Sequence, residues 1–521
     1  MKAFWAIIRL TCRSAVRTHL FRGLLLLLLG VTFGVPLFVK SDGTAVGMIR
    51  ITLEYCFSLT AFLLCVSAVW FGGAEITSDV TDARLHMIVS KPVSRTMVFL
   101  AKFTGVLLIH GVLLILAAGI IYGLTMYRIH SAELSPREEE VLKHEVLTAR
   151  KLYKPEFSED EVNKAAEEML ERMLAEARAR GEEMPEEWRY ARNDKGQFDR
   201  AEILKRMRET YRINRDRIVP GDVHVWKFPG LPEDLDGPVR IRFKIYSSET
   251  QSQQGATYGL WGWRYNHPLK DSDTGERGDS DILFFPENED ASFTAFRQTE
   301  LEIEPREKAG EKKAHSYQCV RSPLKFLGTG QNYEAVPVAF PGPEHRMVRN
   351  GTGTLLFQNL DRRHTLFIQR SDGPFLLVPE TGFISNYCRA VLAVFLEIAA
   401  FASLGTAFSA CFSLPMGILL SVSYVIFSAA TQFVLQLFTA TAVKPHNLLE
   451  WISFYAGRGA QYVLIGTDNF SPASMLASGE LIEFSVLGSQ FLFNTVLKTL
   501  PFFLLGLYCY HRRELALAAK E

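Results

Sequence analysis

The first part of the chain has one charged, patterned segment that a soluble partner could bind. It is residues 72–105, GGAEITSDVTDARLHMIVSKPVSRTMVFLAKFTG. They lie between two long apolar runs, and their centre is Ser90-Lys91-Pro92-Val93-Ser94-Arg95. Proline disfavours the helical conformation at the residue before it, so Pro92 is predicted to end a short helix over Thr81–Val89. Ser94 is predicted to cap the helix of the next apolar run. The stretch therefore predicts an elbow between two membrane helices.

The balanced charge of the chain hides a sharp division along the sequence. The 57 basic and 57 acidic residues cancel, so the total charge favours neither an acidic nor a basic partner. Residues 20–127 and 386–510 are dominated by apolar residues, whereas 128–380 is charged and rich in turn-forming residues. The Leu24–Leu29 run is not interpreted as a signal peptide, because no small-residue cleavage site follows promptly and more apolar runs come after it. The composition predicts a membrane protein with a large soluble insertion.

Six segments are long enough to cross a membrane as helices, which takes about 20 mostly apolar residues. They are Phe21–Val39, Ile51–Phe71, Val98–Tyr122, Tyr387–Phe412, Leu414–Phe438 and Leu487–Tyr510. Lys498 lies near the middle of the last segment. A lysine there costs about 2.5–3.5 kcal/mol unless it faces other helices or reaches the membrane surface.

Lysine and arginine near the span ends predict the orientation, because flanks rich in these residues stay in the cytoplasm. They gather before the first span, in the elbow and after the last span. With six spans, these three places lie on one side of the membrane. We therefore expect a multi-pass protein of the cell (inner) membrane, with both termini and the loop 72–100 in the cytoplasm and the insertion outside.

The sequence predicts four regions: a first membrane half at 1–127, an extracytoplasmic helical arm at 128–220, an extracytoplasmic β-sandwich at 221–380 and a second membrane half at 381–521. In the arm, the Ser135 to Glu138 and Ser158 to Glu161 segments are capping boxes that begin helices. In the sandwich, 239–246 alternates apolar and polar residues, which indicates a strand with one buried face. Many short strands with turn residues between them favour an antiparallel sandwich, of which a jelly roll is one form. The fold class is a six-helix membrane bundle with an inserted extracytoplasmic α+β domain.

An outer interfacial segment is expected at 440–483, between the fifth and sixth spans. Within it, 448–464 is amphipathic and too interrupted for a span. A helix at the outer membrane interface and a re-entrant hairpin both fit this pattern.

Two further groups of residues are candidate sites. Ionisable residues inside predicted spans are functional candidates by default, and here they are His110, Glu397 and Lys498. The alternative is a structural polar contact at a helix seam. Four aromatic residues crowd one segment of the insertion and could form a platform for a sugar ring or polymer: Tyr258, Trp261, Trp263 and Tyr265. The alternative is that these rings fill the core of the sandwich, because aromatic side chains bury large areas.

Catalytic and metal-binding patterns are not found in the sequence. No HExxH, CxxC or Ser/His/Asp arrangement occurs, and the only cysteine of the insertion is Cys319. The chain also lacks the G-x-x-x-x-G-K-[ST] phosphate-binding loop, so it is not an ATPase by that route. We expect a non-catalytic chain that binds no metal and no cofactor of its own.

The elbow resembles the cytoplasmic loop of ABC-2-type transporter permeases. In that family an acidic residue at the end of the second span leads to a coupling helix, a KPVSR box and a lysine that opens the third span. The ending Tyr510-His511-Arg512-Arg513-Glu514-Leu515 is similar to the tail of such permeases, and 353–386 is similar to a subgroup with a large extracytoplasmic domain after the third span. The family's frequent Gly-Thr is replaced by Thr81-Asp82-Ala83.

The resemblance implies a dimeric permease that docks two ATP-binding subunits on its cytoplasmic face, with ATP and Mg²⁺ on those subunits. Closure of the ATPases would push the coupling helices and rearrange the bundle. The residues implied in coupling are Glu75, Asp79, Asp82, Arg84, Lys91, Pro92, Arg95 and Lys102. The implied partners are the ATPase, a second permease copy or a homologue, and the lipid bilayer, with no nucleic acid.

Three functions remain open at this point. The chain is expected to be a permease subunit that exports a substrate, or one that transmits motion to its outer domain. The alternative from another class is a membrane-anchored extracytoplasmic protein that binds a carbohydrate or polymer through its sandwich.

Overall fold

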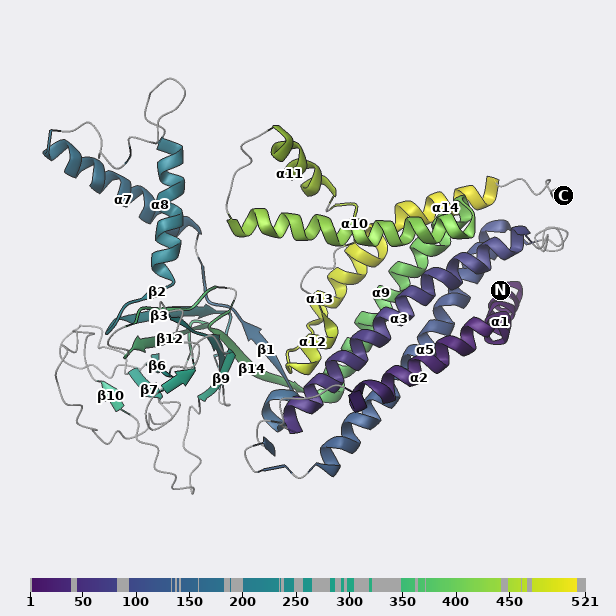
Figure 1. The fold of residues 1–521 in the computed structure, drawn as a ribbon, viewed down its shortest axis with the longest axis horizontal. Coiled ribbons are helices and arrows are strands. Elements are labelled where there is room, and N and C mark those ends of the chain that lie inside the picture. The colour runs from purple at the N-terminus through teal and green to yellow at the C-terminus, as the bar shows by residue number, and fades with distance from the viewer. Residues whose placement is uncertain are drawn as a thin grey trace. The chain divides into compact units, whose positions relative to one another are not determined.

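Figure 1 shows the computed structural model of the 521-residue chain. It describes residues 2–38, 45–81, 93–132, 134–135, 138–139, 142–157, 159–181, 188, 200–233, 235, 239–247, 256–264, 282–285, 292–294, 298–303, 318–320, 348–360, 364–370, 372–441, 448–460, 462–465 and 471–512. The chain forms two compact units. The helical unit comprises Met1–Ala149 and Glu380–Glu521, and the inserted unit comprises Arg150–Pro379.

The helical unit contains the long apolar helices of the chain. Its elements are α1 (Lys2–Arg17), α2 (His19–Phe38), α3 (Ala45–Thr81), α5 (Arg95–Ser131), η1 (Leu142–Val146), α9 (Phe383–Cys411), α10 (Leu414–Thr441), α11 (Leu448–Ala460), α12 (Pro472–Ala477), α13 (Phe484–Ser489), η4 (Gln490–Leu497) and α14 (Leu500–Arg512). In the described part of the chain, six stretches are long and apolar enough to cross a membrane: His19–Pro36, Val46–Ser78, Arg95–Ser131, Phe383–Cys411, Leu414–Thr431 and Phe484–Arg512. The six predicted spans are therefore confirmed as helices of membrane-spanning length and composition.

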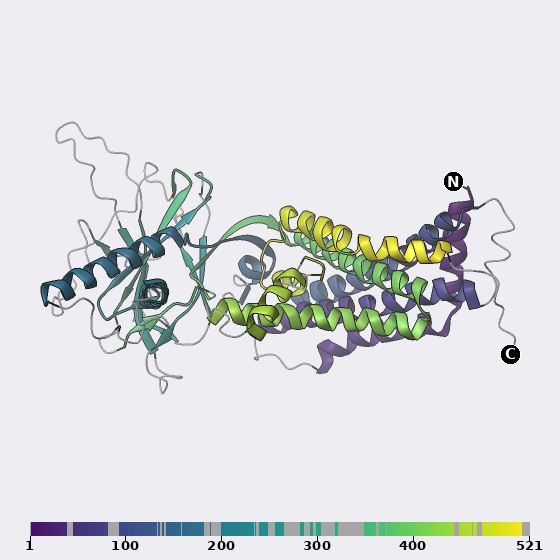
Figure 2. The same ribbon diagram turned by 90° about the horizontal axis from the view of Figure 1, so that it is seen from above.

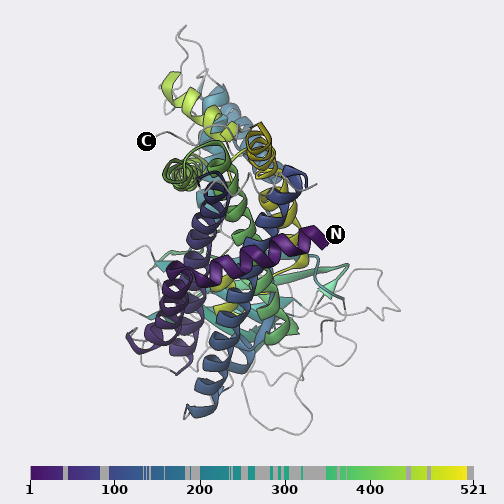
Figure 3. The same ribbon diagram turned by 90° about the vertical axis from the view of Figure 1, so that its right-hand side faces the viewer.

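Helices α3, α5 and α9 form the centre of this unit and share its largest apolar core. Close approach between α3 and α9 depends on glycine: a Cβ on Gly405 would lie 2.5 Å from the carbonyl oxygen of Val69, and one on Gly72 would lie 2.9 Å from Thr406. Figure 2 shows α10 and α14 running alongside α9. Helix α1 lies across the bundle and packs on α5 (Figure 3).

The segment after α11 is fixed to the middle of α10 rather than to its end. The Tyr424 hydroxyl accepts a hydrogen bond from the amide of Ile465 at 3.0 Å and donates to the carbonyl of Val463 at 2.9 Å. The Ser428 hydroxyl donates to the carbonyl of Ile465. Two side chains of α10 thus form hydrogen bonds with the non-helical backbone of 463–465. The two alternatives for 448–464, an interfacial helix and a re-entrant hairpin, both stay predictions.

The inserted unit begins with helices on one small apolar core. Helices α7 (Glu159–Ala179) and α8 (Arg200–Arg215) pack through Ala166, Leu170 and Ile203. Strand β1 (Thr148–Tyr153) precedes them, although the sequence predicts that this part of the chain is helical. The capping box at Ser135 forms as predicted: the Ser135 hydroxyl accepts from the Glu138 amide, and the Glu138 carboxylate accepts from the Ser135 amide at 3.0 Å.

Three sheets make up the rest of the inserted unit, and the strand pairs with a described register are antiparallel. The first has the order β1, β14 (Phe375–Gly382), β4 (Val239–Lys244) and β9 (Gln298–Ile303). The second has the order β10 (Gln318–Val320), β7 (Ile282–Phe285), β6 (Ala256–Arg264), β12 (Thr352–Asn359) and β11 (Val348–Arg349), with β3 (Val223–Pro229) on β12 and β8 (Ser292–Thr294) on β6. The third has the order β2 (Arg217–Ile218), β13 (Leu366–Phe367) and β5 (Tyr246–Ser247). Side chains of all three sheets enter one apolar core.

The prediction of one buried face for β4 is wrong. Its residues from Val239 to Phe243 are all buried, including Arg240 and Arg242. The strand is central, between β14 and β9, and its register places Arg240 opposite Glu302 and Arg242 opposite Glu300. The alternation of charged and apolar residues in β4 therefore does not mark a face open to solvent.

Candidate functional site

Those of the residues predicted to contact an ATPase that the structure describes lie at one end of the helical unit, which we call the Tyr510 end. Glu75 is on α3, and Arg95 and Lys102 are on the first turns of α5. Asp79 belongs to α3, but its side chain lies outside the described residues, as do Asp82, Arg84, Lys91 and Pro92. The predicted short helix of the elbow therefore also lies outside the described part.

The N-terminus of α5 begins where the sequence predicts. Ser94 has extended backbone angles, φ −71° and ψ 143°, and its hydroxyl accepts a hydrogen bond from the Met97 amide at 3.3 Å. A serine in this position satisfies one of the amides left free at a helix N-terminus. This cap sets the start of the helix that carries Arg95 and Lys102.

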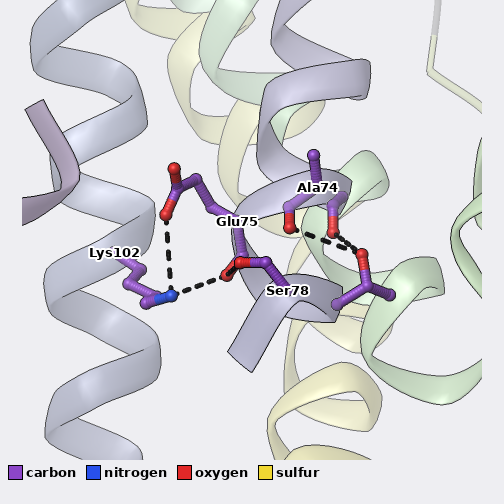
Figure 4. A network of polar contacts seen from close by, with 6 residues as sticks. Ala74, Glu75, Ser78 and Lys102 are labelled. Carbon is purple, nitrogen blue, oxygen red and sulfur yellow. Dashed lines mark hydrogen bonds and ion pairs between the residues drawn. The ribbon is translucent and has the colours of Figure 1, made fainter. Parts of the chain in front are cut away.

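Lys102 and Glu75 form a buried contact between α5 and α3 (Figure 4). The Lys102 ammonium donates to the Glu75 carbonyl oxygen at 2.6 Å and lies 3.6 Å from the Glu75 carboxylate. The two side chains are 8% and 13% exposed, so water screens this pair little. The Ser78 hydroxyl donates to the same carbonyl at 3.3 Å. The lysine therefore binds both the charge and the backbone of the acidic residue.

Helix α1 packs on α5 next to the pair of Lys102 and Glu75. Thr11 packs against Gly105 of α5, where an added Cβ would lie 2.9 Å from the Thr11 methyl carbon. Burial raises the pKa of the Cys12 thiol, and the negative charge of Glu75 raises it further. The Glu75 carboxylate is thus within electrostatic reach of α1 as well as of Lys102.

Arg95 connects the elbow to the C-terminal tail. Its guanidinium donates a hydrogen bond to the carbonyl oxygen of His511 at 2.8 Å, and a cation at this place suits the negative end of the α14 dipole. Next to it, Phe99 of α5 contacts Tyr510 and Phe503 of α14, with ring centroids 5.5 and 5.1 Å apart. The two sequence segments that carry the family resemblance, the elbow and the tail, therefore meet at one place.

The candidates inside the spans differ in their surroundings. His110 is buried, with Nδ1 2.8 Å from the Val106 carbonyl oxygen and Nε2 2.9 Å from the Ser67 hydroxyl. Both of its ring nitrogens are satisfied by protein groups, as in a structural polar contact. Glu397 is half-buried on α9. Lys498 follows η4, where the helix pattern changes before α14.

Sequence reasoning missed three polar neighbours of Lys498 within the sixth span. Gln490, Asn494 and Thr495 lie on η4, and the Asn494 amide donates to the Gln490 side-chain oxygen at 2.6 Å. The Thr495 hydroxyl donates to the carbonyl oxygen of Leu396 at 3.2 Å, which fixes η4 against α9 next to Glu397. The spacing of four residues from Gln490 through Asn494 to Lys498 was a visible signal, because it places the three on one helix face.

The proposed aromatic platform is not formed by its two tryptophans. Trp261 and Trp263 are fully buried in the core of the sheets, where Trp261 contacts Phe243 and Phe357 at ring-centroid distances of 4.7 Å. They are separated by Gly262 on β6, so both lie on the same face of the sheet, the face that packs into the apolar core. The side chain of Tyr258 and all of Tyr265 lie outside the described residues. The core interpretation of these tryptophans is therefore the correct one.

Within the described residues, no group of three metal-ligating side chains comes together. Comparison of the chain with known protein families, with curated proteins and with solved structures finds no match.

Proposed function

We propose that this chain is the integral membrane permease subunit of an ATP-binding-cassette transporter. We further propose that a separate ATPase subunit binds the Tyr510 end and transmits its conformational change to the chain there. One observation carries the proposal: Arg95 of the elbow binds the His511 carbonyl of the tail. Two turns further along α5, Lys102 binds Glu75. A force applied to the elbow would therefore reach α3, α5 and α14 together.

The proposal includes an orientation. The Tyr510 end carries the basic flanks of the sequence and faces the cytoplasm, whereas the inserted unit faces outward. The permease acts as a dimer with itself or a homologue, while ATP and Mg²⁺ bind to the partner ATPase. This chain supplies no catalytic group.

Transmission of motion, rather than export of a substrate, is supported by one feature of the chain. Strand β14 of the inserted unit ends at Gly382, and the membrane helix α9 begins at Phe383 with no linker between them. A shift of α9 would therefore be passed directly to a strand of the first sheet. The carbohydrate-binding alternative loses the support of Trp261 and Trp263, because both are buried.

Site-specific photo-cross-linking in the native host tests the proposal. A photoreactive residue replaces the exposed Ser94 at one end of α5, and a matched control replaces Tyr127, 70% exposed, near the other end. We expect the Ser94 position, and not the Tyr127 position, to capture a chain that carries a phosphate-binding loop. Capture at both positions, or at neither, would contradict the assignment of this end as the ATPase contact.

A further inference from the structure

Helix α1 packs on the bundle through one narrow face. Ile8, Thr11 and Ala15 are buried, and their spacing of three and four residues places them on one side of the helix. A Cβ on Gly105 of α5 would lie 3.0 Å from the Thr11 Cβ and 3.6 Å from the Ile8 carbonyl oxygen, so α1 lies directly against α5 here. The opposite face of α1 therefore points away from α5.

That opposite face carries a row of arginines. Arg9, Arg13 and Arg17 follow one another at intervals of four residues, and all three are exposed, as is Lys2. Helix α1 contains no Asp or Glu, and the first acidic residue of the chain is Asp42. No carboxylate of this helix therefore neutralises the row. We call Lys2, Arg9, Arg13 and Arg17 the basic face of α1.

Large apolar side chains border the basic face on both sides. Trp5, Leu10 and Val16 are 62%, 66% and 52% exposed. Because a helix turns about 100° per residue, Trp5 and Val16 lie on one side of the arginine row and Leu10 lies on the other. Exposed apolar side chains beside cationic ones are typical of a helix at a membrane interface, where the former reach the hydrocarbon boundary and the latter contact headgroups.

The junction with α2 fixes the position of α1. Thr18 is the single residue between α1 and the candidate span His19–Pro36. Its hydroxyl donates to the Ala15 carbonyl oxygen of α1 at 2.7 Å and accepts from the Phe21 amide of α2 at 3.2 Å. One side chain thus holds the end of α1 against the start of α2, and α1 lies across the bundle where this span begins (Figure 3).

Anionic phospholipid headgroups match this surface in charge and in position. Each Lys or Arg near an anionic membrane surface strengthens binding about fivefold, and α1 carries no acidic residue to oppose it. An acidic protein surface would match the arginines but would leave Trp5 and Leu10 beside them without an apolar partner. A membrane surface accepts both kinds of side chain, and Thr18 keeps α1 within one residue of the span.

We propose that α1 lies in the membrane interface and that its basic face binds the headgroups of anionic phospholipids. Trp5, Leu10 and Val16 reach the hydrocarbon boundary beside these headgroups. The bound lipid holds α1 from outside, while Thr11 and Gly105 hold it against α5 from inside. This binding needs only the chain and the bilayer, so it does not depend on an ATPase partner.

Lipid retention by the purified full chain tests the proposal. The chain in detergent is exposed to equal amounts of anionic phosphatidylglycerol and zwitterionic phosphatidylcholine with the same acyl chains, and retained lipid is counted by native mass spectrometry. We expect wild type to retain more phosphatidylglycerol than phosphatidylcholine. In R9Q/R13Q/R17Q we expect the ratio of the two retained lipids to fall about fivefold or more, which is the effect of at least one arginine near an anionic surface.

Two matched variants separate the charge of α1 from the total charge and from the fold. R172Q/R178Q/R180Q removes three exposed arginines of the inserted unit and is expected to keep the wild-type ratio. R9K/R13K/R17K keeps the charges of α1 and is also expected to keep it. An unchanged ratio in R9Q/R13Q/R17Q would overturn the proposal. An equal fall in either matched variant would also overturn it, because the effect would then not belong to the charge of this face.

A photoreactive phosphatidylglycerol tests the wild-type chain directly and does not depend on how a variant folds. We expect its cross-links to include residues 2–17 and not 159–179 of α7. Cross-links at other helices of the bundle but none in 2–17 would overturn the proposal. So would an R9Q/R13Q/R17Q protein that keeps the wild-type lipid ratio but loses a co-purifying protein, because the basic face would then be a protein contact.

Discussion

At the scale of single residues, Lys102 is the group on which the Tyr510 end depends most. Its ammonium serves two acceptors of Glu75, the carbonyl at 2.6 Å and the carboxylate at 3.6 Å. Loss of the lysine leaves a buried carboxylate and a buried carbonyl without this donor, whereas loss of the carboxylate leaves the shorter bond in place. Lys102 and Glu75 therefore contribute unequally to the stability of the helical unit.

We predict that K102M destabilises the helical unit by about 3 kcal/mol, because removal of one partner of a buried pair leaves the other charge uncompensated. E75Q is predicted to cost much less, and the double variant less than the sum of the two. Thermal denaturation of the detergent-solubilised protein, followed by size-exclusion chromatography, measures these differences. An E75Q protein as unstable as K102M would show that the carboxylate, and not the carbonyl, is the main acceptor.

His224 of β3 gives the inserted unit a pH-dependent stability. Burial and then the positive charge of Arg215 lower the pKa of His224 from 6.5 to about 4. Between these values the unfolded chain binds a proton that the folded chain does not, so protonation favours unfolding. The stability that neutral His224 contributes is complete above pH 6.5 and is lost as the pH falls toward 4, by up to about 3 kcal/mol.

Hydrogen exchange of peptides from β3 and β12, corrected for the intrinsic pH dependence, measures this loss. His224 faces Phe357 in the register of these strands, so both should lose protection between pH 6.5 and 4. H224F removes the titrating group and is predicted to flatten the profile. An identical profile in H224F would assign the pH dependence to another residue.

At the scale of elements, the contact between α3 and α9 depends on small residues. A Cβ on Gly405 would lie 2.5 Å from the carbonyl oxygen of Val69 and 2.7 Å from its Cα. Both are backbone atoms, so α3 and α9 must move apart to make room for the added Cβ. Gly119 of α5 has no atom within 4 Å of the corresponding position among the described residues.

We predict that G405A lowers stability by about 1–3 kcal/mol, as overpacking of a close contact does. G119A is predicted to be neutral or slightly stabilising, because alanine favours helix more than glycine does. The same denaturation assay compares the two variants. Equal changes in stability in the two variants would show that helix propensity, and not the contact between α3 and α9, determines the effect of the substitutions.

The elements also show how far a sequence predicts this structure. The cap at Ser94 and the six long apolar helices follow from local properties, namely residue type, length and hydropathy, and they are found in the structure. Gly119 and Gly123 of α5 have the GxxxG spacing that permits close helix approach, but a Cβ on either would have no atom within 4 Å in the described chain. Gly405 of α9 makes a close helix contact instead, because the backbone of Val69 on α3 lies against it.

At the candidate site too, residue types can be chosen from the sequence, whereas contacts between distant residues cannot. Glu75, Lys102 and Arg95 could be chosen from the sequence, but the bond from Arg95 to His511 joins residues 416 positions apart. The burial of Trp261 and Trp263 and of both arginines of β4 likewise depends on neighbouring strands that the sequence does not name. Polar groups within the sixth span were visible, but their position beside Glu397 follows only from the packing of η4 on α9.

At the scale of the whole molecule, the central claim is that this chain works with a separate ATPase. A six-span bundle whose elbow and tail are bound together at one end has more organisation than an anchor requires, and it fits a membrane subunit that receives force. The inserted unit, continuous with α9 through β14, is then the part that the force reaches.

The most direct measurement is purification of the wild-type chain from its native host in a mild detergent, with the co-purifying proteins identified and quantified by mass spectrometry. The account predicts a subunit with a phosphate-binding loop in a one-to-one ratio with this chain, and its loss in R95E but not in R13E, a reversal of an exposed arginine on α1. A chain that purifies without such a subunit, or a subunit that stays bound in R95E, would contradict the account.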